Sequence, residues 1–157
     1  MMKRIPLLIL ILFFVSSLNI RAERYYYFDH MTTSDGLSSN TIYCTMQDSN
    51  GFMWIGTRDG LCRYDGNNFR NMREIAREDG ISGNIYAINE DSEGRIWYST
   101  PNGVHIYDPM SGKTNSLGIG EETSCFTIQT DTKGKVWLIA DSLYRYDSSH
   151  ICKESLR

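Results

Sequence analysis

The 157-residue chain has few of the residue patterns that enzymes use for catalysis or for binding metals. It contains three histidines, His30, His105 and His150, and none has the spacing of metal ligands or lies near a Gly-x-Ser-x-Gly nucleophile motif. No glycine-rich phosphate loop or dinucleotide fingerprint opens a helix. We therefore predict no catalytic residue, no metal site and no cofactor, and we interpret the chain as not being an enzyme.

Cysteine is also scarce, with four residues and no Cys-x-x-Cys pair for zinc or redox chemistry. An even number would permit disulfides in an exported protein, but the spacing indicates no framework. We expect mostly free cysteines that act as small apolar core residues, at Cys44, Cys62, Cys125 and Cys152.

The chain has a single long apolar run, from Ile5 to Leu18, which is shorter than the roughly twenty residues a membrane-spanning helix needs. Lys3 and Arg4 precede this run, and Ala22 follows it as a plausible cleavage position. Residues 1–22 are therefore predicted to be a signal peptide. We expect a periplasmic protein that has no membrane span after cleavage.

The formal net charge is −3, and loss of residues 1–22 removes three basic side chains and lowers it to −6. A surface of this sign does not favour phosphate backbones. We predict no nucleic-acid partner.

The rest of the chain repeats one pattern three times, at intervals of 43 and then 40 residues. Each copy has Asp-x-x-Gly-x-x-Trp, then a second turn, then a Tyr-Asp pair. Periods of this length built from short strands are typical of propeller blades. The repeated positions are Asp48, Gly51, Trp54, Gly60 and Tyr64, then Asp91, Gly94, Trp97, Gly103 and Tyr107, then Asp131, Gly134, Trp137 and Tyr146.

Short runs rich in β-branched and aromatic residues predict an all-β fold: a partial β-propeller of about three four-stranded antiparallel blades. We expect blades at 41–80, 81–120 and 121–157, with a lone strand and lead-in at 23–40. In the first blade the strands are expected at 41–47, 52–57, 61–64 and 68–72.

The repeated Asp and Gly suit the first and fourth positions of a type I turn. A calcium loop would need oxygen ligands at alternate positions, and only one acidic position recurs, so the turn is the favoured interpretation. The tryptophans could stack on sugar rings, but their fixed register in every copy favours packing between blades.

The segment Trp54-Ile-Gly-Thr-x-x-Gly60-Leu, with Leu37-Ser-Ser-Asn and Asp48-x-x-Gly51 before it, resembles the two-component regulator propeller repeat. Trp97 and Trp137 are followed by different residues, so the third copy is the weakest match. The resemblance implies the periplasmic sensor region of Bacteroidetes hybrid two-component sensor histidine kinases. It also implies an oligosaccharide or similar small ligand, and a kinase region that this sequence does not contain.

Three blades cannot close a ring of roughly four to eight. We therefore expect unpaired edges, self-association, and either the remaining blades or a second copy as a partner. The sequence is interpreted as the opening of a longer sensor, or as a truncated or remnant form of one.

In a propeller, the loop between the second and third strands of a blade emerges on the same face as the connection between blades. This places Arg58, Asp59, Asn102 and the segment 79–84 on one face, where they are candidate ligand contacts. Two alternatives remain open: the opening blades of a secreted propeller enzyme, such as a lyase or quinoprotein-like dehydrogenase, and a non-catalytic interaction scaffold or remnant.

Overall fold

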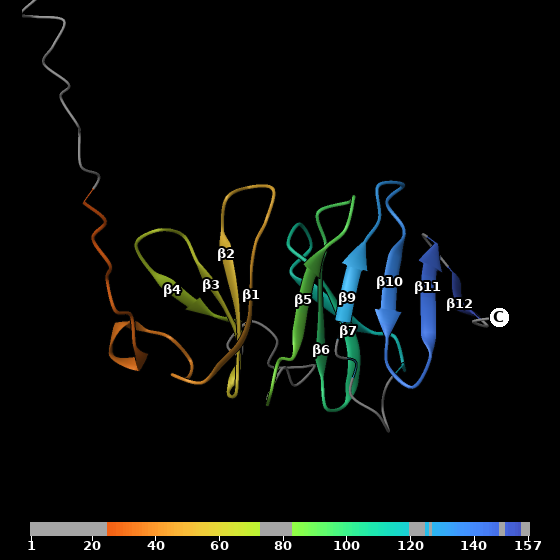
Figure 1. The fold of residues 1–157 in the computed structure, drawn as a ribbon, viewed down its shortest axis with the longest axis horizontal. Helices are drawn as coiled ribbons and strands as arrows, with labels where there is room; N and C mark the ends of the chain where they lie inside the picture. The colour runs from red at the N-terminus through yellow and green to blue at the C-terminus, as the bar shows by residue number, and fades with distance from the viewer. Residues whose placement is uncertain (1–24, 73–82, 120–124, 126, 148–149, 155–157) are drawn as a thin grey trace, which may run out of the picture. The chain divides into compact units, whose positions relative to one another are not determined.

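The computed structural model describes residues 25–72, 83–119, 125, 127–147 and 150–154. These residues form three four-stranded antiparallel sheets, so the predicted all-β fold of a partial propeller is confirmed (Figure 1). In each sheet the strands follow one another in chain order. The first sheet contains β1 (Ile42–Gln47), β2 (Met53–Thr57), β3 (Gly60–Tyr64) and β4 (Phe69–Asn71); the second contains β5 (Ala87–Glu90), β6 (Ile96–Thr100), β7 (Gly103–Asp108) and β8 (Lys113–Ser116); the third contains β9 (Thr127–Thr130), β10 (Val136–Ile139), β11 (Leu143–Asp147) and β12 (His150–Glu154).

The second sheet lies between the other two, and the burial of its strands reflects contacts on both of its faces (Figure 1). Successive side chains of a strand point to opposite faces of its sheet. All five residues of β6 are buried, because both faces of the middle sheet are covered. Buried residues alternate with more exposed ones along β10, because among the described residues only one face of the third sheet is covered.

Two apolar clusters join the sheets. The first cluster brings Trp54, Leu61 and Met72 of the first sheet against residues of the second, and the other brings Trp97 and Val104 of the second sheet against the third. Each sheet therefore stabilises its neighbour more than it can stabilise itself, as expected for repeat proteins. From the second sheet the first cluster takes Ile88, Ile96, Tyr98 and Tyr107, and from the third sheet the other takes Ile128, Val136 and Leu138.

Gly56 shows how closely the first two sheets approach. A Cβ placed on this residue would lie 2.5 Å from Cys44 Sγ and 2.9 Å from the carbonyl oxygen of Ile85. The amide of Ile85 also donates a 2.9 Å hydrogen bond to the carbonyl of Thr57. The chain entering the second sheet is thus held by backbone contact against the end of β2.

The N-terminal part of the chain separates into a unit of residues 1–30, of which the structure describes residues 25–30. These residues have no regular secondary structure, and their four consecutive aromatic side chains are 73–93% exposed. The predicted lone strand is not formed here, and because its expected partner is a further blade, its pairing stays a prediction. The predicted signal peptide at 1–22 lies outside the described residues.

The lead-in to the first sheet contains a short 3₁₀ helix, η1 (Thr33–Asp35), that the sequence analysis does not predict. Thr32 and Asp35 form a reciprocal capping box around it, and Gly36 ends it in a left-handed conformation. The next residue, Leu37, is buried. The lead-in is therefore anchored just before β1.

Candidate functional site

Each sheet carries the same bond between the first turn and the tryptophan of the second strand. The indole Nε1 donates to an aspartate Oδ2 over 2.7 Å in the first sheet, 2.7 Å in the second and 3.0 Å in the third. The other carboxylate oxygen accepts the backbone amides of the turn, and the fourth turn residue is a glycine with a positive φ of 77–88°. The sequence analysis assigned the aspartate only to the turn. The constant Asp-x₅-Trp spacing is the signal that could have revealed the bond. The pairs are Asp48 with Trp54, Asp91 with Trp97, and Asp131 with Trp137.

The tryptophans contact the next sheet through the tyrosine of its Tyr-Asp pair. The rings of Trp54 and Tyr107 are 5.9 Å apart, and those of Trp97 and Tyr146 are 4.9 Å apart with an edge-to-face tilt of 66°. Trp54 and Trp97 are fully buried. These two rings are therefore occupied by packing between sheets, and sugar stacking on them is excluded in this arrangement.

The predicted ligand contacts Arg58, Asp59 and Asn102 lie in the turns that join the second and third strands. The Thr57 hydroxyl accepts from the Asp59 amide, and the equivalent Thr100 hydroxyl accepts from the Asn102 amide, both over 3.0 Å. The two turns are thus held in the same way at the same end of their sheets. Within the described residues, the Arg58 side chain is 63% exposed and makes one loose ion pair, 3.8 Å from Asp59.

Of the segment 79–84, the structure describes Gly83 and Asn84. The Asn84 amide donates a 2.8 Å hydrogen bond to the hydroxyl of Tyr86. Asn84 thereby lies at the same end of the second sheet as the turn at Asn102, because the Tyr86 amide donates to the carbonyl of Ser99, next to Thr100. The structure therefore brings the described part of this segment to the predicted face.

Tyr43 and Tyr86 form an aromatic pair across the first two sheets that the sequence analysis does not identify. Their ring centroids are 5.4 Å apart, with the planes inclined at 54°. The pairing of β1 with β2 shifts between Ile42 and Cys44, which leaves Tyr43 as an extra residue in the ladder. A β-bulge of this kind redirects a side chain, and bulges are common next to functional sites. The only available sequence signal was the repeated Ile-Tyr at the start of both blades.

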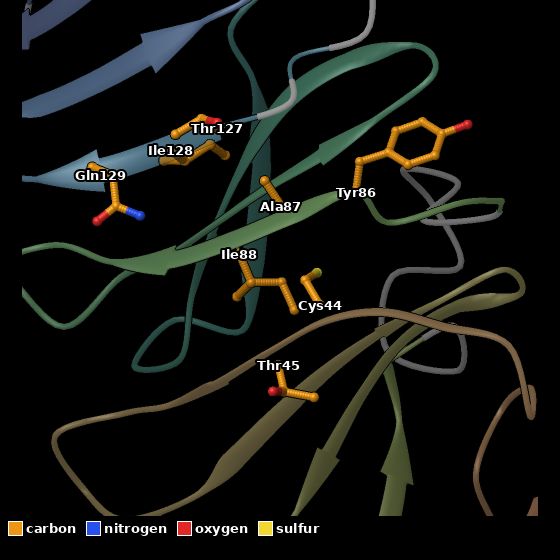
Figure 2. A pocket seen from close by; sticks show the side chains of 8 residues that line it. All are labelled: Cys44, Thr45, Tyr86, Ala87, Ile88, Thr127, Ile128 and Gln129. Carbon is orange, nitrogen blue, oxygen red and sulfur yellow. The ribbon is translucent and has the colours of Figure 1, made fainter.

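The first strands of the three sheets, with Tyr86 just before β5, line a widely open pocket of about 250 Å³. Figure 2 shows Tyr86 at one end of the lining residues, with its ring turned away from Ile88, and Gln129 at the other end. The lining mixes hydroxyl, amide and aliphatic groups. The eight residues are Cys44, Thr45, Tyr86, Ala87, Ile88, Thr127, Ile128 and Gln129.

The cysteine in this pocket is poorly suited to nucleophilic chemistry. Burial raises the pKa of the Cys44 thiol to about 11, although a backbone hydrogen bond at Gly56 lowers it in part. The thiolate is the reactive form, so Cys44 stays protonated at neutral pH. Burial also raises the pKa of Cys125, and all four cysteines are free.

Among the described residues, no three His, Cys, Asp or Glu side chains converge as metal ligands. A search of the same part of the chain found no helix with the length and hydropathy needed to span a membrane.

A family model for the "Two component regulator propeller" matches residues 36–59 and 79–102. A histidine kinase of Formosa agariphila is 36% identical over 73 residues, which are 46% of this chain and 5% of that protein. The chain thus spans a small part of the curated relative that it matches.

Solved structures share the fold. The extracellular domain of a hybrid two-component system from B. thetaiotaomicron superposes with a TM-score of 0.66 at 23% identity, over 78% of this chain and 17% of that one. A second extracellular domain of such a system from the same organism gives 0.64 at 18% identity, over 76% and 19%. The matched segments 36–59 and 79–102 contain the first strand, the first turn and the second strand of the first two sheets. Over residues 36–59 and 79–102, the chain is therefore similar to the two-component regulator propeller repeat.

Proposed function

We propose that this chain supplies ligand-sensing blades to the exported propeller of a two-component sensor. The observation that carries the proposal is the pair of matches to the regulator propeller repeat, which cover the first two strands of the first and second sheets. The tryptophans of the two matched segments pack between sheets and are not available to a ligand. We therefore assign ligand recognition to the loops at one end of the sheets. The chain itself performs no catalysis; in a complete sensor, a kinase region would receive the signal through the membrane.

The proposed ligand is an oligosaccharide or a similar small polar molecule. It would bind at the end of the sheets where Arg58, Asp59 and Asn102 lie, beside the pocket between the first strands. Drug-sized ligands occupy pockets of roughly 300–1,000 Å³. The pocket here has about 250 Å³, which suits one sugar unit better than a whole oligosaccharide.

The proposed location is the periplasm, with residues 1–22 removed during export. The proposed partner of the third sheet is a further blade or a second copy of the chain. Ile139 is half-exposed on that sheet and Trp137 is more exposed than the tryptophans of the other two sheets, which supports an unfilled packing surface.

The full chain, expressed in bacteria with its N-terminus intact, tests both parts of this proposal. Mass spectrometry of the periplasmic fraction is expected to show a product that begins near residue 23. Isothermal titration with a panel of maltohexaose, cellohexaose, laminarihexaose, xylohexaose and hexagalacturonate is expected to give saturable binding of at least one member. A chain retained uncleaved in the cytoplasm would refute export, and a panel without any binding would refute the proposed ligand class.

A further inference from the structure

The Tyr43 and Tyr86 pair joins two sheets and is partly open to solvent, with Tyr86 itself half-buried. Tyr43 is 44% exposed, whereas Trp54, Trp97 and Tyr107 are 6% exposed or less. Single exposed aromatic residues are common on protein surfaces and need no explanation. Here two tyrosines from different sheets lie with ring centroids 5.4 Å apart and planes inclined at 54°, so their ring faces adjoin across the boundary between the sheets.

Both tyrosines are held in place by the backbone and by one side chain. The bulge between Ile42 and Cys44 turns Tyr43 out of the ladder. The Tyr86 amide donates to Ser99 over 3.0 Å, and its hydroxyl accepts from Asn84 over 2.8 Å. A ring fixed in this way loses little conformational entropy when a ligand stacks on it.

Polar groups lie near the pair and along the pocket that Tyr86 borders. The Arg58 amide donates to the carbonyl of Thr41 over 3.0 Å, which places the turn carrying the exposed Arg58 side chain beside the start of β1. Tyr86 also lines the 250 Å³ pocket, together with the hydroxyl of Thr45 and the amide of Gln129. Figure 2 shows the Tyr86 ring at the edge of this lining, turned outward.

An aromatic pair that borders a pocket with hydroxyl and amide groups, in the neighbourhood of an exposed arginine, matches the chemistry of a pyranose, which has an apolar C–H face and a rim of hydroxyls. A neutral sugar is favoured over a uronic acid for two reasons. The chain without residues 1–22 carries a net charge of −6, which repels anions. The nearby Arg58 is also partly neutralised by Asp59 at 3.8 Å.

We propose that Tyr43 and Tyr86 form the stacking platform for one neutral pyranose ring of an oligosaccharide, with the adjoining sugar unit in the pocket between the first strands. This inference rests on the proposed function and names the subsite within the face described above. Both tyrosines are needed for stacking because each ring forms one part of the proposed platform.

The test is isothermal titration of the full chain with the same five hexasaccharides, followed by titration of variants with the tightest binder. Tyr43→Ala with Tyr86→Ala is expected to raise the Kd by at least about tenfold, which corresponds to about 1.4 kcal/mol. Tyr43→Phe with Tyr86→Phe keeps the ring faces and is expected to stay within about threefold of the wild type. Tyr27→Ala removes a tyrosine that is 93% exposed, outside the sheets, and should leave the Kd unchanged.

The single variant Tyr43→Ala keeps the test independent of folding, because the ring is nearly half-exposed and its loss leaves both apolar clusters intact. It is expected to weaken binding at least about threefold with an unchanged far-ultraviolet circular dichroism spectrum. If the double alanine variant and Tyr43→Ala both bind the hexasaccharide with the Kd of the wild type, this inference is overturned and the proposed function still stands. Preference for hexagalacturonate would overturn the neutral class, and absence of any wild-type binding would overturn the proposed function together with the inference.

Discussion

The bond between Asp91 and Trp97 should contribute strongly to stability, because both partners are buried. Trp97 is fully buried and Asp91 is 6% exposed, so water cannot replace the 2.7 Å hydrogen bond when it is lost. Asp91→Asn keeps an amide oxygen for the backbone amides of Glu93 and Arg95. It replaces Oδ2, which accepts from both the Trp97 indole and Arg95 Nε over 2.7 Å, by a donor. A buried donor without a partner costs about 1–3 kcal/mol, and bonds to charged groups lie at the upper end, so we expect a loss of about 2–3 kcal/mol.

The third sheet provides a matched control. Asp131→Asn makes the same chemical change, but Trp137 is only partly buried and its 3.0 Å bond can be replaced by water. We expect this variant to lose less than about 1 kcal/mol. Asp91→Asn also removes an ion pair with Arg95 that Asp131 lacks among the described residues, so the contrast combines burial with this ion pair. The double-mutant cycle with Trp97→Phe separates the indole bond from both.

The assay is urea unfolding of the full chain at neutral pH, at two protein concentrations so that self-association is recognised. A double-mutant cycle with Trp97→Phe is expected to show a coupling of about 1.5–3 kcal/mol between Asp91 and Trp97. Equal losses for Asp91→Asn and Asp131→Asn, or a coupling near zero, would refute the reasoning that burial makes this bond important.

Three further predictions follow from other contacts. Gly56→Ala should destabilise the chain by about 1–3 kcal/mol in a thermal melt, because its Cβ would overlap Cys44 and the backbone of the next sheet; a neutral effect would contradict this close approach. Iodoacetamide at pH 8 should label the exposed Cys152 well before Cys44, whose burial raises its pKa to about 11, and equal rates by mass spectrometry would contradict that burial. The bond from the indole of Trp137 lowers the pKa of Asp131, so its stabilising effect is present above the unfolded pKa and is lost as the pH falls through the folded one. Trp137→Phe should therefore flatten the loss of stability below about pH 4, and an unchanged acid limb in urea titrations would exclude this contribution.

The sheets and their order were predictable because each depends on local sequence. The repeat period, the turn residues and the β-branched runs act within a few residues of one another, and they place β2 and β3 within one residue of the expected bounds. The indole-to-carboxylate bond could not be read in the same way, because its geometry depends on side-chain orientation within the folded hairpin. The constant Asp-x₅-Trp spacing is visible in the sequence, but the spacing alone does not show that the two side chains are hydrogen-bonded.

The tyrosine pair was beyond prediction for a different reason. It requires a bulge, which shifts the pairing register by one residue, and it requires two sheets to lie at a particular distance. Tyr43 in a regular ladder would alternate with Cys44 and point to a face of the sheet. The distance between the sheets depends on the close approach at Gly56 and Ile85. Nothing in the sequence around Tyr43 indicates this contact.

The same contacts connect the proposed platform to the packing between sheets. Ile85 is fully buried against the first sheet, its amide is bonded to Thr57, and the next residue in the chain is Tyr86. A ligand that draws the two tyrosine rings together or apart therefore acts directly on the residue that fixes the spacing of the sheets. Because close-packed interfaces resist small continuous displacements, such a ligand should favour one packing arrangement over another. If the proposed platform binds a ligand, we therefore expect the binding energy to act on an interface between sheets, through Ile85.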